Sequence, residues 1–336
     1  MNPIARSTFR RRWIAQAASL PVALALTALS GIASAQTGTY PNRPITMMVS
    51  FAVGGATDLT ARALASHLSD KLGQSVVVEN APGASTSIGT ARVARAPKDG
   101  YTVLFSTAST FTITPHLKPK LDINLDDFDL IAPVGSVSFA LATRRDFLAR
   151  NLNEFVAAAK ARPKGINNAT PGAGSVSDIL SRYVYKKFGV TVEEVHYRGE
   201  GPAMLDLLSG RTDTLFVSLP LAAQHLNAGS IHSVAISGRK RSPLLPNVPT
   251  FIELGYADLF GDSWQIVMVP TGTPAPIAAR LNTAINEIAR QPAFIEQLAK
   301  LGAETMSAPP AEIRMLLLEE RKRWGAVVVE NKITVD

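Results

Sequence analysis

Residues 45–58 read Ile45-Thr46-Met47-Met48-Val49-Ser50-Phe51 and then Ala52-Val53-Gly54-Gly55-Ala56-Thr57-Asp58. The first half is an apolar run between a proline and a pair of glycines, which predicts a buried strand. Residues 58–72 carry apolar side chains at helical spacing and end before Gly73, a frequent helix stop. The chain therefore passes from a strand through a glycine-rich loop into a helix.

The same pattern continues outward along the chain. Strands are expected at 76–79 and 101–106 around a helix at 87–96, so the first part reads β-α-β-α-β and predicts a parallel sheet covered by helices. Further expected strands are 134–143, 192–196, 214–218, 234–237 and 264–269. Further expected helices are 153–161, 176–188, 202–208, 276–290, 293–301 and 311–329. We find no internal repeat in the sequence.

The first 35 residues have the pattern of a cleaved secretory signal peptide. Arg10-Arg11-Arg12 closes a basic start, an alanine-rich apolar stretch follows, and Ala33-Ser34-Ala35 supplies small residues for cleavage before Gln36. An uncleaved membrane anchor fits less well, because the apolar stretch is short and contains Pro21. The arginines suit the general secretory and the twin-arginine routes equally, so the export route stays open.

Charge and cysteine content exclude several classes. The chain has 336 residues, no cysteine and a formal net charge of +7. Four of the 34 basic residues and none of the 27 acidic ones lie in residues 1–35, which leaves a net charge of +3 for the rest. Such a balance, without clusters of basic and aromatic residues, predicts no nucleic-acid partner. Without cysteine, disulfides and thiolate catalysis are excluded.

Three loops rich in glycine and small residues each follow an expected strand and open an expected helix. They are residues 52–58, 80–86 and 170–175. In a parallel sheet, ligands bind beyond the carboxyl ends of the strands. Glycines let the backbone approach a ligand, and the free N–H groups of a helix start favour an anion. The loops predict a carboxylate ligand. The alternative is that Thr57 or Asp58 only caps a helix.

Motifs for other chemistry are missing from the sequence. There is no Gly-x-x-x-x-Gly-Lys-[Ser/Thr] phosphate loop, and Gly54-Gly55 lacks the spacing of a dinucleotide-binding loop. The five histidines show no close metal-ligand spacing, and there is no Gly-x-Ser-x-Gly nucleophile motif. We therefore expect no catalytic residue, no metal and no cofactor.

Short motifs in order along the chain carry a family resemblance. They include Phe51-x-x-Gly54-Gly55-x-x-Asp58-x-x-Ala61-Arg62, Glu79-Asn80-x-Pro82-Gly83-Ala84, Asp99-Gly100-Tyr101-Thr102, His196-Tyr197-Arg198-Gly199 and Pro270-x-Gly272-Thr273-Pro274. Together they resemble the receptors of the tripartite tricarboxylate transporter family, also called Bug receptors. The resemblance covers essentially the whole chain after the signal peptide.

The resemblance implies an α/β fold of the two-lobed periplasmic-binding-protein (Venus-flytrap) type, with mixed, mostly parallel sheets flanked by helices. Residues 36–139 and 264–336 would form lobe 1, and residues 140–263 would form lobe 2. The implied ligand-binding residues are Gly55, Thr57, Asp58, Ala84, Ser85, Ser106 and Thr107 from lobe 1, and Thr170, Gly174, Ser175, Tyr197 and Val217 from lobe 2.

The sequence departs from the family pattern at several of these positions. Val217 stands where the family often has an aspartate that holds the amine of a ligand, and Ser85-Thr86 stands where two glycines are usual. Asp178 stands where a histidine is common. We therefore expect a ligand without an ammonium group.

The function expected from loops and resemblance together is that of a monomeric periplasmic receptor without enzymatic activity. It would capture a small carboxylate-bearing organic acid for the inner-membrane permease subunits of a tripartite tricarboxylate-type transporter. Two alternatives stay open. One is a ligand-sensing subunit for a membrane signalling protein, and the other is an exported enzyme built on the same scaffold.

Overall fold

The computed structural model describes residues 40–121, 124–147, 149–197 and 199–334. The chain divides into a unit of residues 1–42 and a unit of residues 43–336, and everything below concerns the second. The expected signal peptide lies outside the described residues. Within the described ranges, no helix has the length and apolar character needed to cross a bilayer.

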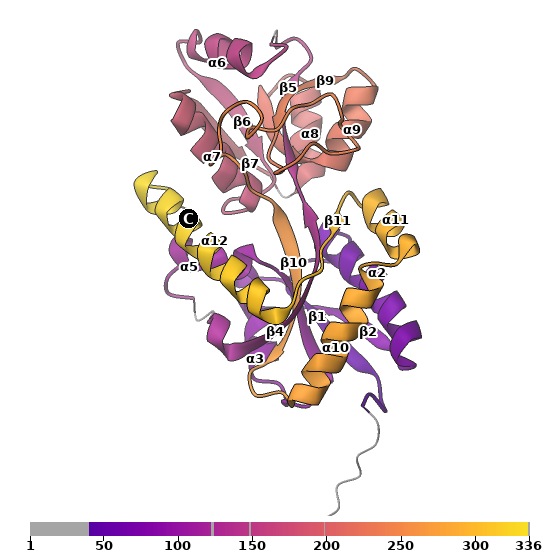
Figure 1. The fold of residues 1–336 in the computed structure, drawn as a ribbon. Helices are drawn as coiled ribbons and strands as arrows, with labels where there is room; N and C mark the ends of the chain where they lie inside the picture. The colour runs from indigo at the N-terminus through magenta and orange to yellow at the C-terminus, as the bar shows by residue number, and fades with distance from the viewer. Residues whose placement is uncertain (1–39, 122–123, 148, 198, 335–336) are drawn as a thin grey trace, which may run out of the picture. The chain divides into compact units, whose positions relative to one another are not determined.

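Sheet A has six strands in the order β11-β4-β10-β3-β1-β2 (Figure 1). They are β1 (Ile45–Val49), β2 (Val76–Asn80), β3 (Thr102–Thr107), β4 (Phe128–Val137), β10 (Ser263–Pro270) and β11 (Glu304–Thr305). Strand β1 is parallel to β2 and β3, whereas β10 is antiparallel to both β3 and β4. The apolar run of residues 45–51 thus becomes an inner strand, buried on both faces as the sequence predicts.

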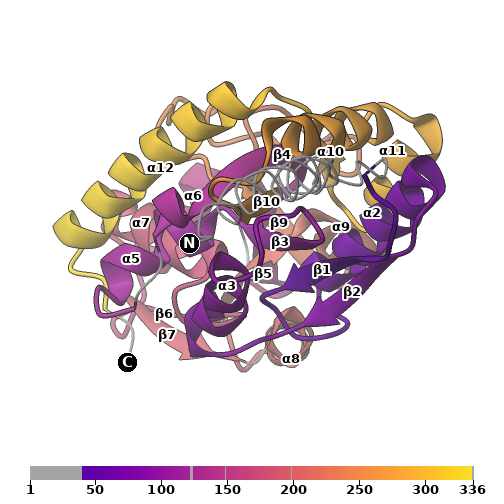
Figure 2. The same ribbon diagram turned by 90° about the horizontal axis from the view of Figure 1, so that it is seen from below.

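Helices cover both faces of sheet A. On one face α2 (Ala56–Leu72) and α10 (Ala275–Ile288) contact each other (Figure 2), with α11 (Pro292–Lys300) beside α2. On the other face α3 (Ser87–Ala94), the short α4 (Ser109–Thr112) and the start of α12 (Pro310–Glu330) share one apolar cluster with the sheet. The short α5 (Thr114–Leu117) follows α4.

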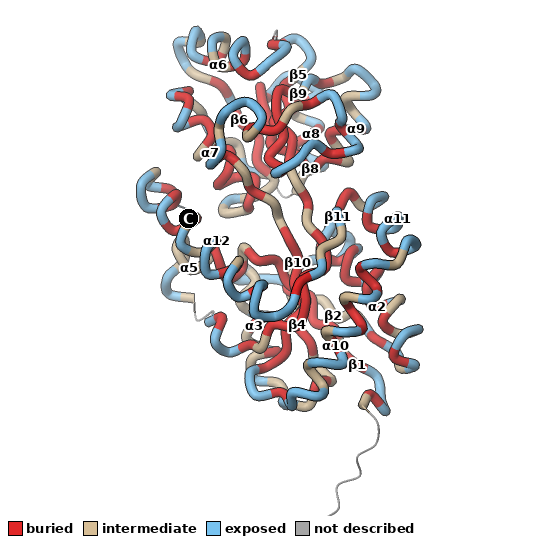
Figure 3. Tube along the Cα trace, in the orientation of Figure 1, coloured by how far each residue is buried: buried red, intermediate tan, exposed pale blue. Residues whose placement is uncertain are grey.

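Sheet B has five strands in the order β7-β6-β8-β5-β9. They are β5 (Phe139–Arg144), β6 (Ile166–Thr170), β7 (Val192–His196), β8 (Thr214–Ser218) and β9 (Ile231–Ile236). One face packs against α6 (Leu152–Lys160) and α7 (Val176–Phe188), and the other packs against α8 (Glu200–Leu208) and α9 (Leu219–Asn227). Both sheets are buried and the outer helix faces are exposed (Figure 3).

The strand expected at 134–143 is in fact two strands in two sheets. It ends at Val137 in sheet A and resumes at Phe139 in sheet B, with Ser138 between them. Strand β10 returns to sheet A, where it runs antiparallel to its neighbours. For this reason the sheets are mixed but not mostly parallel: among the pairings of described strands, four are parallel and five antiparallel.

Helix α12 belongs to the packing of both sheets. Ile313 and Leu317, near its start, lie in the apolar cluster of sheet A. Trp324 and Val328, near its end, lie in the cluster formed by sheet B, α6 and α7. The lobe boundaries stay a prediction, although strand membership changes within one residue of both internal boundaries, at Phe139 and at Ser263.

Candidate functional site

A cavity of about 370 Å³ is lined by residues from both sheets and their connecting loops. Neutral hydroxyl groups dominate its polar lining, contributed by Thr57, Thr86, Thr107, Ser109, Thr110, Thr114, Ser175, Ser177 and Ser263. Apolar walls come from Phe51, Leu117, Phe139 and Val176. Among the described lining residues, the charged ones are Lys118 and Glu200. The volume suits a small organic molecule.

The hydroxyls that follow strand β3 form two hydrogen-bonded groups. Thr86 donates to the Thr110 hydroxyl at 3.1 Å, and Thr110 shares a hydrogen bond with buried Ser106 at 3.0 Å. Thr107 and Ser109 share another at 2.8 Å. A hydroxyl both donates and accepts hydrogen bonds. Each group of hydroxyls can therefore turn its hydrogens toward an anion without carrying a charge itself.

The start of α2 is held by Asp58. Its carboxylate accepts the backbone N–H of Gly54 at 2.9 Å and Nε of Arg62 at 3.0 Å. Asn80, at the end of β2, donates to the other carboxylate oxygen at 2.9 Å. Burial opposes ionisation of Asp58, but the hydrogen bonds from Arg62, Gly54 and Asn80 outweigh it and lower its pKa. Asp58 therefore shapes the loop that carries Thr57 to the cavity.

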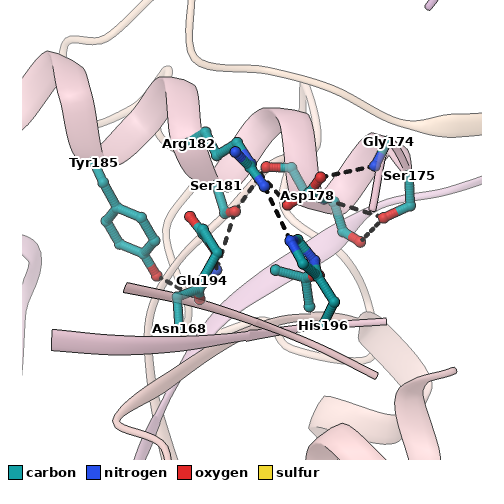
Figure 4. Close-up of polar contacts among 11 residues, drawn as sticks. Asn168, Gly174, Ser175, Asp178, Ser181, Arg182, Tyr185, Glu194 and His196 are labelled. Carbon is teal, nitrogen blue, oxygen red and sulfur yellow. Dashed lines mark hydrogen bonds and ion pairs between the residues drawn. The ribbon is translucent and has the colours of Figure 1, made fainter. Parts of the chain in front are cut away.

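The start of α7 uses the same arrangement (Figure 4). The Asp178 carboxylate accepts the N–H of Gly174 at 2.8 Å and Nε of Arg182 at 3.0 Å. The Ser175 hydroxyl accepts the N–H of Asp178 at 3.2 Å, which completes a cap of the helix start. Asp178 holds the loop whose Gly174 and Ser175 line the cavity.

These two helix starts form a short internal repeat, contrary to the sequence analysis. In both, a glycine N–H binds the carboxylate four residues on, and that carboxylate binds the arginine four residues further: Gly54, Asp58 and Arg62, then Gly174, Asp178 and Arg182. We call each set a Gly–Asp–Arg cradle. The repeat was missed because only three residues at fixed spacing carry it, one of them through its backbone N–H.

Behind the second cradle lies a polar network that runs from buried Asn168 to exposed His196 (Figure 4). Arg182 also donates to Nε2 of His196 at 3.2 Å, and Nδ1 of His196 lies 2.8 Å from the Thr170 hydroxyl. Asn168 donates to Glu194 at 2.7 Å. Burial, with the nearby Asp178 charge, raises the pKa of Glu194 to about 7, although the hydrogen bond from Asn168 opposes the shift.

Glu200, the first residue of α8, brings a carboxylate to the cavity. The backbone N–H of Ser218, at the end of β8, donates to Oε1 of Glu200 at 2.8 Å. The Ser218 hydroxyl donates to Oε2 at 2.6 Å. Burial raises the pKa of Glu200, and the two Ser218 hydrogen bonds oppose that shift.

The structure brings four of the expected ligand-binding residues to the cavity: Thr57, Thr107, Gly174 and Ser175. Others lie directly behind it, with Asp58 in the first cradle, Ser106 bonded to Thr110, and Thr170 buried and bonded to His196. Gly55 is the exposed N-cap of α2, and Ala84 is exposed with a φ of 45°. The side chain of Ser85 is outside what the structure describes.

Two residues that were expected at the ligand make their contacts elsewhere. Val217 is fully buried in the apolar cluster between sheet B and helices α8 and α9, and does not line the cavity. The Tyr197 hydroxyl donates to Asp206 at 2.7 Å, and burial together with that carboxylate raises its pKa to about 12. Because Val217 does not line the cavity, it cannot contact a ligand there, and the expectation of a ligand without an ammonium group stays a prediction.

The hydroxyls after β3 and both charged lining residues were not predicted from the sequence. Ser109, Thr110 and Thr114 follow the expected strand within a few residues, and this density of hydroxyls was a usable signal. Lys118 and Glu200 gave no such signal, because a single charged residue at a helix end is common on any protein surface. Among the described residues, no three His, Asp or Glu side chains gather as a metal site.

Comparison with known proteins identifies the family. Residues 60–333 match the family described as tripartite tricarboxylate transporter family receptor. The Bug protein BugT of Bordetella pertussis is 37% identical over 307 residues, which cover 90% of this chain and 94% of BugT.

Solved structures extend the comparison. MatC of Rhodopseudomonas palustris with bound malate is 31% identical, with a TM-score of 0.74 over 86% of this chain and 100% of MatC. Another R. palustris protein, solved with adipate, is 29% identical, with a TM-score of 0.79 over 88% of this chain and 99% of its own. These similarities confirm the expected two-lobed periplasmic-binding-protein fold. The chain belongs to the tripartite tricarboxylate transporter family of receptors.

Proposed function

We propose that this protein is a periplasmic receptor that captures a small carboxylate-bearing organic acid between its two lobes and delivers it to the membrane subunits of a tripartite transporter. The observation that carries the proposal is one hydroxyl-lined cavity reached by both cradled helix starts, α2 through Thr57 and α7 through Gly174 and Ser175. The family and the dicarboxylates bound by its relatives support the same ligand class.

The cavity suits capture of a carboxylate by neutral donors. Hydroxyls of Thr86, Thr110 and Ser175 and the helix starts of α2 and α7 supply hydrogen bonds without a fixed counter-charge. Such donors bind a carboxylate yet release it more readily than a buried ion pair would, because no unpaired charge remains after release. A receptor that hands its ligand to a permease needs that reversibility.

We further propose that the protein has no enzymatic activity of its own. A hydrolase or lyase would need a nucleophile paired with a base, or a metal, at the cavity. The lining hydroxyls of Thr86, Thr107, Ser109 and Thr110 are bonded to other hydroxyls, and no histidine is among the described lining residues. Ligand binding without turnover is what this lining supports.

The test is a thermal-shift and calorimetry panel on the purified protein. The acids are malate, adipate and pentanoate with its amino derivatives, and the matched controls are the corresponding uncharged amides. At a ligand concentration of about 100 times its Kd, we expect at least one acid to raise the midpoint of thermal unfolding by several degrees. The amides should have no effect. Amides that bind as well as acids, or an acid consumed during the titration, would refute the proposal.

A further inference from the structure

Glu200 is the one acidic residue among the described lining residues, whose polar side chains are mostly hydroxyls. Its carboxylate lines the space directly, and the Ser218 N–H and hydroxyl hold one oxygen each. No described lysine, arginine or histidine forms an ion pair with it, and the other charged residue of the described lining, Lys118, belongs to the segment after α5. Within the described part of the chain, the carboxylate of Glu200 is thus half-buried and has no cation paired with it.

Two features around Glu200 stabilise its ionised form and oppose the effect of burial, which raises its pKa. Both oxygens accept hydrogen bonds from Ser218, one of them from a backbone N–H that can only donate. Glu200 is also the first residue of α8, where the helix dipole stabilises a negative charge. A carboxylate has about four acceptor positions, so two remain after the Ser218 bonds for a donor inside the cavity.

A buried carboxylate in a ligand cavity selects among ligands by charge. It repels a second carboxylate on the ligand. An alkyl end of the ligand offers no hydrogen-bond donor to the free lone pairs of the Glu200 carboxylate. An ammonium group satisfies those lone pairs and neutralises the charge at once. Glu200 therefore distinguishes the end of a ligand that faces α8 from the end held by the hydroxyls.

We propose that Glu200 is a specificity-determining residue that binds the ammonium group of the ligand, so that the receptor takes amino-carboxylates in preference to dicarboxylates and simple carboxylates. This rests on the proposed function, in which the hydroxyls and helix starts hold the ligand carboxylate.

The experiment measures affinities by calorimetry at neutral pH for ligands of matched length. The probes are 2-aminopentanoate, 5-aminopentanoate, 2-hydroxypentanoate, pentanoate, glutarate and adipate. The proteins are the wild type, Glu200→Gln, and Glu193→Gln as a matched control, because Glu193 is an exposed glutamate on β7 away from the cavity. Glutamine keeps the shape of the side chain and an oxygen that accepts from Ser218, so the fold is retained.

We expect the wild type and Glu193→Gln to bind an amino-carboxylate more tightly than any other probe. Glu200→Gln should lower the affinity for that ligand by about 10- to 100-fold and change the affinity for pentanoate by no more than about twofold. The affinity for adipate or glutarate should rise. A merely structural role for Glu200 would instead weaken every probe by the same factor, and that result overturns the proposal.

Two other outcomes separate this inference from the proposed function. Preference of the wild type for a dicarboxylate, a hydroxy acid or pentanoate overturns the role of Glu200 and leaves carboxylate capture standing. Failure of every carboxylate to bind overturns both.

Discussion

Glu194, behind the second cradle, makes the stability of the folded protein depend on pH. Burial, with the Asp178 charge nearby, raises its pKa to about 7 from an ordinary value of 4.5. The folded protein therefore holds this proton more tightly than the unfolded chain. The stability that depends on Glu194 is complete below about pH 4.5 and is lost as the pH rises through 7.

Replacing Glu194 by glutamine should remove this loss. The glutamine oxygen still accepts from Asn168 and carries no charge to bury. We expect Glu194→Gln to unfold with nearly the wild-type free energy at pH 4 and to be about 1–3 kcal/mol more stable at pH 8. Urea unfolding between pH 4 and 8 measures the difference. The matched change Glu193→Gln, on the exposed neighbour, should show no such trend, and a pH-independent effect at Glu194 would contradict the assignment.

For single residues, the types of residue at the cavity were easier to predict than whether a given side chain points into it. Thr57, Thr107, Gly174 and Ser175 were expected at the ligand and do line the cavity. Val217 was expected there and is in the core. Four of the five residues of β8 are buried, so the strand shows no polar alternation from which the cavity-facing side can be read.

Helix starts are the elements that shape this cavity, and their geometry depends on few bonds. In α2 the loop 52–57 is tied to the helix by the Asp58 carboxylate, which also binds Arg62 and Asn80. The predicted helix, residues 58–72, begins only two residues late, because Asp58 looks like a cap and is in fact the third residue of the helix. The shape of the loop before α2 also depends on Asn80, which lies 22 residues from Asp58 and could not be predicted from the local sequence pattern.

Asp58→Asn should loosen this helix start. An amide is a weaker acceptor and carries no charge for Arg62, so we expect a loss of about 1–3 kcal/mol in the free energy of unfolding and weaker binding of the carboxylate ligand. Asp70→Asn is the control, an exposed aspartate on the same helix, and should change neither. Urea unfolding and calorimetry measure the two effects, and equal behaviour of both variants would remove Asp58 from the cavity's support.

Elements with one clear periodicity were predicted well, and transitions were not. The bounds of β7 are those expected, and α12 differs by one residue at each end. The apolar run 134–143 hides a change of sheet at Ser138, since both sides of the change are buried and equally apolar. No element was expected at residues 219–227, where α9 lies with Pro220 in its first turn.

For the molecule as a whole, Gly302 marks a contact between the parts that carry sheet A and sheet B. It has a φ of 75°, and a Cβ atom there would lie 1.5 Å from Cγ of Pro220 in α9. Gly255 has a φ of 92° with no described atom within 4 Å of such a Cβ. Alanine at either site carries similar backbone strain, but only at Gly302 does it collide with another segment.

Gly302→Ala should therefore hold the two sheets apart. We expect it to bind the ligand roughly tenfold more weakly than Gly255→Ala and to show a larger radius of gyration in small-angle scattering with ligand present. Identical scattering and affinity for the two variants would show that Pro220 moves aside at no cost and that this contact does not govern closure.

Helix α12 also has a consequence for how the two sheets depend on each other. Its residues Ile313 and Leu317 belong to one apolar cluster, and Trp324 and Val328 belong to another. Loss of packing along this one helix would expose apolar surface in both clusters at once, so the stability of one sheet is coupled to that of the other.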